Sequence, residues 1–171
     1  MNIKLSLLAI VEILSGLSIG IVIMIITYKI LMWIGRKRYD IHQNNLAYSI
    51  FMASVLFSVG YMVSGVIQPL LSLFRIMAAS GSSTIELLLS FIGYGAFYIA
   101  SSYFAGVVVS LVGITIYTGL TPIDEFAEVK NNNLGVALVV GTIIIVLTLL
   151  TRDGVNLLME SQIPYPIHFT Q

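Results

Sequence analysis

The chain has 171 residues, of which 58% are hydrophobic and only 9% are charged, and its formal net charge is zero. A soluble domain carries about 25% charged residues, so this composition excludes a water-soluble protein. The zero net charge argues against a nucleic-acid partner, because a phosphate backbone requires a clustered basic surface. With no cysteine, and with His42 and His168 far apart in the chain, we expect no disulfide, no metal site and no cofactor.

Four long stretches of the sequence are uncharged or nearly so. A bilayer core is about 30 Å thick, and a helix crosses it with roughly 20 apolar residues. Transmembrane β-strands would show short alternating segments, and these stretches do not alternate. The sequence therefore predicts an all-α membrane protein that forms a single membrane domain over residues 1–171. The four predicted transmembrane helices cover about residues 5–34, 46–74, 87–120 and 134–159.

Basic residues in the loops predict an orientation. Lys and Arg gather in the cytoplasmic loops of membrane proteins. The first loop contains Arg36, Lys37 and Arg38, and the third contains Lys130, whereas the opposite side carries fewer basic residues. We therefore expect the first and third loops to be cytoplasmic and both termini to lie outside. The cluster at residues 36–38 is also expected to face lipid headgroups.

The first and third loops resemble each other. Shifting the sequence by 88 positions places residues 40–47 on residues 128–135, and each pair in this window is identical or chemically close. Outside the window, the similarity falls to shared hydrophobicity. An even number of helices separates the two units, so both would point the same way. The sequence thus predicts two parallel two-helix repeats, at about residues 5–75 and 87–160.

An Asn-rich segment in each predicted repeat precedes a transmembrane helix. The first N–H groups of a helix lack partners within it, and an Asn side chain accepts hydrogen bonds from them. We expect Asn44 or Asn45 to cap the second helix and Asn132 or Asn133 to cap the fourth. The alternative is an anion or lipid-headgroup site at the paired helix N-termini, with positive charge supplied by residues 36–38.

The third loop carries the clearest family pattern, a Thr-Pro start followed by an acidic residue, a Val and an Asn before small residues. The residues are Thr121, Pro122, Glu125, Val129, Asn133, Gly135 and Ala137. The pattern resembles that of the YjfL-type bacterial inner-membrane family, domain of unknown function 350. The resemblance implies four helices with a duplicated two-helix unit, and an inner-membrane location. It carries over no catalytic residue, and the first repeat departs from it, since Trp33 and Ile34 stand where Thr-Pro would be.

Ionisable residues inside transmembrane helices are candidate functional residues. Glu12 lies about 25 Å from Lys29 along the first helix, which places it in the outer leaflet, at a depth similar to that of Arg152. One interpretation is a structural ion pair between Glu12 and Arg152, with Gln68 or Asp153 sharing the network. The others are an interfacial Glu12 without a partner, or a proton- or cation-coupled carboxylate.

Small residues recur at intervals of four in two predicted helices. They are Gly16 and Gly20 in the first helix, and Ser102, Gly106 and Ser110 in the third. Such stripes allow helix backbones to approach closely, which favours association inside a membrane. Either the first and third helices pack against each other within the chain, or the same faces mediate homo-oligomerisation.

The sequence contains no recognised catalytic motif, and no histidine lies in a predicted span, so we expect no enzyme. We expect a non-catalytic integral membrane protein that self-associates or serves as a small subunit of a membrane assembly, for example in envelope maintenance. The alternative is a small ion or solute channel or transporter that uses Glu12. The expected partners are the lipid bilayer and further copies of the chain or other membrane proteins.

Overall fold

A computed structural model of the chain describes the backbone of residues 3–41, 45–79, 84–121 and 124–162. The side chains of residues 3–9, 11–12, 15, 74–75, 78–79, 84, 86–88 and 91 lie outside this description. The described residues form helices joined by turns and loops, without a strand. The helices are α1 (Ile3–Tyr39), α2 (Leu46–Ser64), α3 (Ile67–Ala79), α4 (Thr84–Leu120), α5 (Glu125–Lys130) and α6 (Leu134–Glu160).

Four helical segments are long and apolar enough to cross a membrane. They are Gly16–Tyr39 in α1, Leu46–Leu73 through α2 and α3, Ile92–Leu120 in α4, and Leu134–Glu160 in α6. The prediction of an all-α membrane protein with four transmembrane helices is therefore confirmed, and the chain is a multi-pass membrane protein.

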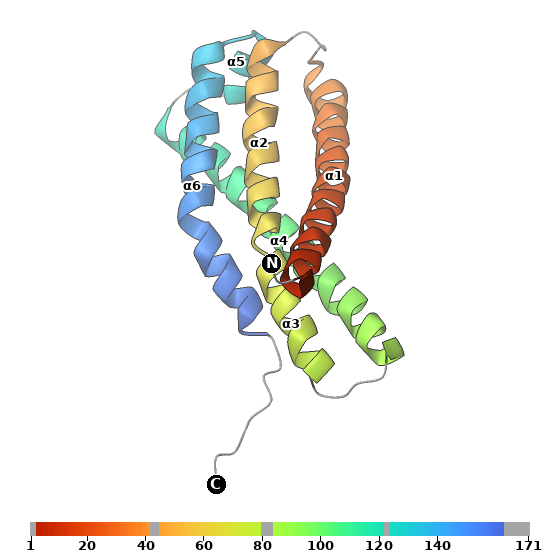
Figure 1. Ribbon diagram of the computed structural model, residues 1–171. Coiled ribbons are helices and arrows are strands. Elements are labelled where there is room, and N and C mark those ends of the chain that lie inside the picture. The colour runs from red at the N-terminus through yellow and green to blue at the C-terminus, as the bar shows by residue number, and fades with distance from the viewer. Residues whose placement is uncertain (1–2, 42–44, 80–83, 122–123, 163–171) are drawn as a thin grey trace.

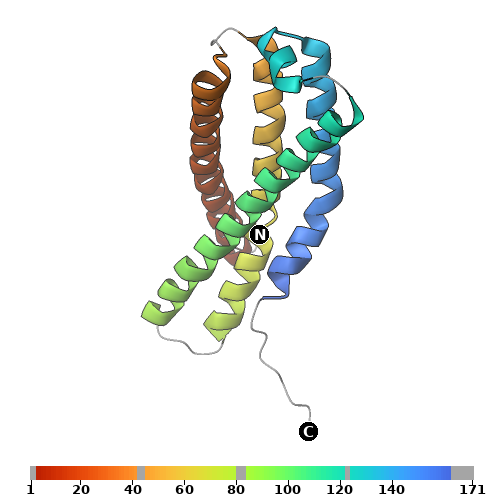
Figure 2. The same cartoon turned by 180° about the vertical axis from the view of Figure 1, so that it is seen from behind.

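The helix α2 occupies the centre of the bundle. It packs against α6, α4 and α1, and α4 also packs against α6. Figure 1 shows α2 between α1 and α6, and Figure 2 shows α4 crossing the back of the bundle diagonally. Because α2 touches each of the other long helices, its side chains are the most buried of the four spans.

The second predicted helix, 46–74, is not continuous, which corrects the sequence interpretation. It breaks after Ser64, and α3 begins at Ile67. The N–H groups of Gly65 and Val66 donate to carbonyls only three residues earlier, at 3.2 and 3.1 Å. Pro69 explains the break, because it has no N–H to donate to the Gly65 carbonyl and its ring crowds that oxygen.

The first and third loops also differ from their predicted extents. α1 continues to Tyr39, five residues beyond the predicted end, so the basic residues 36–38 form its last turn. The third loop contains the short helix α5, where the sequence predicts only a loop. Asp124 caps α5 by accepting from the N–H groups of Phe126 and Ala127, both at 3.1 Å.

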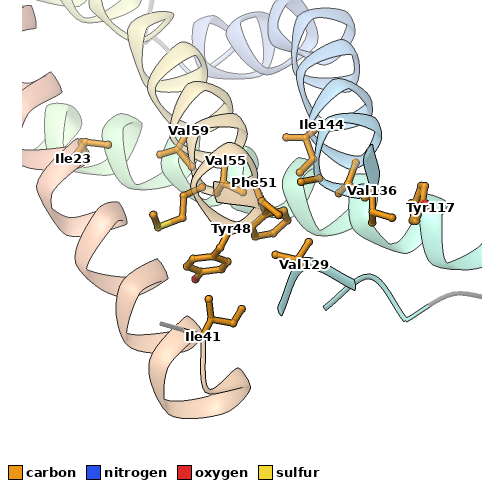
Figure 3. Close-up of a cluster of buried hydrophobic side chains, with 14 of the residues drawn as sticks. Ile23, Ile41, Tyr48, Phe51, Val55, Val59, Tyr117, Val129, Val136 and Ile144 are labelled. Atoms are coloured by element: carbon orange, nitrogen blue, oxygen red, sulfur yellow. The ribbon is translucent and has the colours of Figure 1, made fainter. Parts of the chain in front are cut away.

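The main hydrophobic core lies near the end of the bundle where α5 is placed. Aliphatic and aromatic side chains from every long helix meet there, with α2 supplying the largest share (Figure 3). Val59, Ala137 and Ile144 are fully buried in it. A second, smaller core includes Leu73 of α3 and Tyr98 of α4 and lies on the other side of the break in α2.

Candidate functional site

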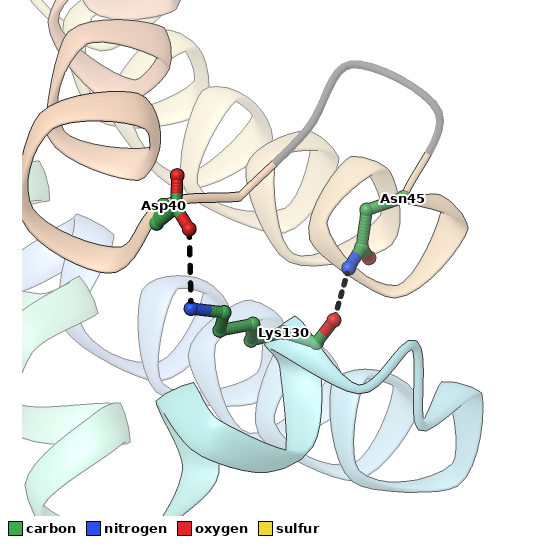
Figure 4. A network of polar contacts seen from close by, with 3 residues as sticks. All are labelled: Asp40, Asn45 and Lys130. Atoms are coloured by element: carbon green, nitrogen blue, oxygen red, sulfur yellow. Dashed lines mark hydrogen bonds and ion pairs between the residues drawn. The ribbon is translucent and has the colours of Figure 1, made fainter.

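The two loops at the α5 end are tied together by Asn45. Its side-chain oxygen caps α2 by accepting from the N–H of Tyr48 at 2.7 Å. Its Nδ2 donates across the bundle to the carbonyls of Val129 and Lys130, at 2.7 and 3.0 Å. One side chain thus caps the start of α2 and also binds the carbonyls at the end of α5, as Figure 4 shows for the bond to Lys130.

Asn132 ends α5 and closes the same contact from the other loop. Its backbone has a φ of 63°, a left-handed conformation that Asn tolerates better than most residues. The N–H of Asn132 donates to the carbonyl of Val129 at 3.0 Å, and the next N–H donates to Glu128 at 2.9 Å, the pair of bonds of a Schellman motif. The Asn132 side chain accepts from the N–H of Ala47 at 3.0 Å.

Asn133 is the N-cap of α6. Its Oδ1 accepts from the N–H groups of Gly135 and Val136, at 3.1 and 3.3 Å, and its Nδ2 donates to Glu128 at 2.7 Å. The prediction that Asn45 and Asn133 cap the second and fourth spans is confirmed. Asn side chains fill both caps, so the geometry favours capping over an anion site at the helix N-termini.

An exposed ion pair adds to the contact between the loops. The Lys130 ammonium lies 3.6 Å from a carboxylate oxygen of Asp40 (Figure 4). The two side chains are 48% and 78% exposed, so the pair contributes little to stability. The Asn45 and Asn132 bonds are therefore the principal polar contacts between the loops.

A cleft of about 440 Å³ lies between α1 and α4, beside α2 and α5. In Figure 2, α1 and α4 diverge toward the α5 end, and α2 is visible between them. Most of the lining is apolar, and the basic side chains occur at one end only. Lining residues include Thr27, Ile30, Ile34, Lys37 and Arg38 of α1, Phe51 and Val55 of α2, Val107, Ser110 and Leu111 of α4, and Phe126 of α5.

Aromatic rings line the α5 end of the cleft. Tyr39 and Phe126 stack with their centroids 4.2 Å apart and their planes nearly parallel, which joins the last turn of α1 to α5. The Tyr48 hydroxyl donates to the carbonyl of Leu31, which fixes α1 against α2. A Cβ at Gly35 would lie 2.6 Å from the Tyr48 ring, so α1 needs a glycine at this crossing.

The basic residues of α1 point to different sides of the helix. Lys37 and Arg38 line the cleft, whereas Lys29 and Arg36 line a shallow concavity elsewhere on the surface of α1, which Lys37 also borders. The Lys37 ammonium lies 5.3 Å from the centroid of the Trp33 ring. The Arg38 guanidinium lies 5.9 Å from the ring of Tyr39.

Buried hydroxyl groups link the three helices of the core. Ser58 of α2 donates to the carbonyl of Gly106 in α4 at 3.2 Å, and it lies 2.7 Å from the Thr148 hydroxyl of α6. Thr148 also lies 2.7 Å from the carbonyl of Ile144, and its single hydrogen serves one of these two acceptors. Ser110 donates to the same Gly106 carbonyl at 2.8 Å.

Arg152 is held by α2 at the other end of the bundle. Its guanidinium donates to the Tyr61 hydroxyl at 3.1 Å and to the Ser64 hydroxyl at 3.3 Å. It also lies 4.2 Å from the centroid of the Tyr61 ring. Among the side chains that the structure describes, Arg152 forms no ion pair. The Glu12 side chain lies outside the described residues, so the predicted ion pair stays a prediction.

The sequence also predicts two other polar positions near Arg152. Asp153 and Gln68 are both exposed. Asn156 of α6, four residues beyond Arg152, fits against Gly65 in the break between α2 and α3, where a Cβ would clash with its amide. Contact between α6 and the broken helix therefore depends on Asn156 as well as on Arg152.

The small-residue stripes do not pack against each other, contrary to one of the two sequence interpretations. A Cβ at Gly106 would lie 2.9 Å from the Cα of Val59, so the α4 stripe packs against α2. Ser102 and Ser110 on this stripe are buried. Gly16 faces Ile67 of α3. The α4 stripe and Gly16 therefore face the central broken helix, whereas a Cβ at Gly20 would meet nothing within 4 Å.

The burial of some polar residues was not predicted from the sequence. Ser58 and Thr148 give no sequence signal, because hydroxyl side chains in helices commonly bond their own backbone. Glu125 is 6% exposed, and its Oε1 has no hydrogen-bond partner among the described residues. The sequence signal for Glu125 is that it is the acidic residue of the family pattern in the third loop.

Comparison with known proteins gives a match at the level of a protein family. No curated protein and no solved structure matches the chain. One family model matches residues 5–155, which include the described cleft, the loop contacts and the buried hydroxyl network. The chain therefore belongs to the family described as Domain of Unknown Function (DUF350).

Proposed function

We propose that the protein is a non-catalytic integral membrane component that self-associates through α1. The supporting observation is the uneven burial of the spans. Only 11% of the hydrophobic window in α1 is buried within the chain, compared with 56% in α2 and α3. A helix that its own chain covers so little is free to pack against a second copy or against another protein of a membrane assembly.

A groove along α1 provides the contact surface. It is lined by Ile13, Leu17, Ile21, Ile25 and Ile67, together with the two glycines of the stripe and Met24. Gly16 is already close to Ile67, but a Cβ at Gly20 would meet nothing within 4 Å. The open notch at Gly20 suits the close backbone approach of a second helix.

Disulfide crosslinking in membranes tests this proposal, because the chain has no cysteine of its own. Ile21→Cys lies in the groove, and Val22→Cys lies at the same depth about 100° around the helix. Oxidation should give dimers with Ile21→Cys and few with Val22→Cys. Adding Gly20→Leu should abolish the dimer, although the new Cβ has no neighbouring atom of its own chain within 4 Å. Equal crosslinking at both positions would contradict a specific α1 interface.

We further propose a bacterial inner-membrane location, with the first and third loops in the cytoplasm and both termini outside. The family assignment supports the membrane, and the basic residues support the orientation. Arg36, Lys37 and Arg38 lie together in the last turn of α1, and Lys130 lies in the third loop at the same end of the bundle.

We also propose that the chain arose by tandem duplication. The cap of Asn45 on the N–H of Tyr48 recurs as the cap of Asn133 on Val136, at the same offset of 88 residues. In electron cryo-microscopy of the chain in nanodiscs, the backbone of residues 16–64 should superpose on that of residues 104–152 by a rotation near 180° about the membrane normal. A poor superposition would contradict the duplication.

A further inference from the structure

We propose that the cleft between α1 and α4 binds one anionic phospholipid. The phosphate would lie at Lys37 and Arg38, and an acyl chain would fill the apolar part of the cleft. This inference goes beyond self-association, because the groove at Gly20 and this cleft have no lining residue in common.

The polarity of the cleft changes along its length as that of a lipid does. From Thr27 to Arg38 the α1 wall extends about 17 Å, and its basic residues occur only in the last turn. Deeper in, the walls are aliphatic and aromatic. The hydroxyls of Thr27 and Ser110 donate to carbonyls of their own helices, both at 2.8 Å, so they need no polar ligand.

The charges at the mouth of the cleft are not neutralised within the described part of the chain. The one ion pair there joins Lys130 to Asp40, so neither Lys37 nor Arg38 has a carboxylate partner among the described residues. Each is exposed and contacts an aromatic ring. Two unpaired cations above an apolar cleft complement an anionic head attached to an apolar chain.

The size and position of the cleft favour a lipid over other anionic ligands. Its volume of about 440 Å³ lies within the range of 300–1,000 Å³ found for small-molecule sites. Most of its lining residues belong to the transmembrane helices α1, α2 and α4, which lipid surrounds in a bilayer. An acidic peptide would have to bury unpaired backbone groups at this depth. Basic pockets between transmembrane helices are known to hold anionic lipid headgroups.

Native mass spectrometry of the full chain in detergent tests the assignment, with palmitoyl-oleoyl phosphatidylglycerol and the matching phosphatidylcholine as probes. The wild type should retain one phosphatidylglycerol per chain and prefer it to phosphatidylcholine. The double variant Lys37→Gln with Arg38→Gln should bind phosphatidylglycerol about 30-fold more weakly, since each basic residue near the headgroup contributes a factor of about five.

Lys29→Gln with Arg36→Gln is the matched control, because it removes the same charge from the same helix outside the cleft. This control should bind phosphatidylglycerol within about threefold of the wild type. Equal weakening of both double variants would show diffuse attraction to the surface of α1 and would overturn the site. All four substituted residues are exposed, so the variants should fold, which circular dichroism checks.

A second pair of variants tests the apolar part. Val107→Trp fills the cleft, and Val108→Trp places the same ring on the exposed face of α4. The first variant should lose the bound phosphatidylglycerol and the second should keep it. Retention of the lipid by Val107→Trp would overturn the proposal.

Competition with inorganic phosphate separates a lipid from a soluble anion. At 10 mM, on the order of a hundredfold excess over the lipid, phosphate should not displace phosphatidylglycerol. Displacement by phosphate would assign the site to a soluble anion instead. Gly20→Leu should keep the lipid, which separates this test from that of self-association.

Discussion

Three consecutive asparagines in the third loop do three different things. Asn131 is the C-cap of α5, Asn132 turns the chain in a left-handed conformation, and Asn133 begins α6. Asn suits this run because its short amide both accepts and donates, and because it tolerates a positive φ. One turn therefore ends α5 and starts α6, and Asn133 supplies an acceptor for the N–H groups of Gly135 and Val136.

The cap of α6 leads to a prediction at Asn133. Asn133→Ala should lower the free energy of unfolding by about 1 kcal/mol, because the N–H groups of Gly135 and Val136 lose their acceptor. Asn133→Gly should cost only a few tenths of a kcal/mol. Thermal unfolding in detergent, followed by circular dichroism, measures both. Equal losses would show that the side chain contributes more than a cap.

Asn45 allows the cap to be separated from the bond between the loops. Asn45→Asp keeps an oxygen for the N–H of Tyr48 but loses the donor to the carbonyls of Val129 and Lys130. The carboxylate would face two carbonyl oxygens, so the variant should be destabilised by about 1–3 kcal/mol. If Asn45→Asp unfolds at the same temperature as the wild type, the bonds from Asn45 to the third loop do not stabilise the fold.

At the scale of elements, the broken helix formed by α2 and α3 determines how the bundle packs. Pro69 removes a hydrogen bond and opens the backbone at Gly65, where Asn156 of α6 fits. On the other side of the break, Gly106 lets α4 approach the backbone of Val59. The central position of α2 therefore depends on one proline and on small residues in its neighbours.

The contact between α2 and α4 predicts opposite effects for two glycines of the same helix. Gly106→Leu should destabilise the fold by about 1–3 kcal/mol, because the new side chain meets the Val59 backbone. Gly119→Leu has open space around its Cβ and should be neutral or stabilising by up to about 1 kcal/mol. Resistance to thermal unfolding in detergent measures the difference. Similar behaviour of the two variants would contradict the packing of α4 on α2.

In the whole molecule, polar contacts between helices occur in the core and at both ends of the bundle. Ser58 and Thr148 link helices within the core, the Asn contacts lie at the loop end, and Arg152 binds α2 near the opposite end. α1 contributes few of these contacts and lies at the edge of the bundle. The polar and packing contacts thus join α2, α4 and α6 most closely, and α1 forms one wall of the cleft.

Labelling of single cysteines tests the proposed orientation. Lys37→Cys lies in the basic last turn of α1, and Gln162→Cys follows α6 at the other end of the bundle. In intact cells a membrane-impermeant thiol reagent should label Gln162→Cys and leave Lys37→Cys unlabelled until the cells are opened. Labelling of Lys37→Cys alone in intact cells would reverse the topology.

The features that depend only on residues near one another in the chain could be predicted from the sequence. Long apolar stretches predict spans because the bilayer core has a fixed thickness, and Asn45 and Asn133 predict caps because a helix start needs acceptors nearby. Family membership also followed from a local pattern in the third loop. Pro69 is the local signal for the break at Gly65, although the uninterrupted hydrophobicity of residues 46–74 predicts one continuous helix.

Tertiary structure decided which faces of these helices meet. The spans are apolar on all sides, since lipid and protein neighbours both favour apolar side chains, so hydrophobicity does not distinguish an inner face from an outer one. The sequence alone therefore did not place Gly106 on Val59 rather than on α1, or join Ser58 to Thr148. The cleft beside Lys37 arises because α1 and α4 diverge over α2, and that divergence depends on backbone contacts between residues far apart in the chain.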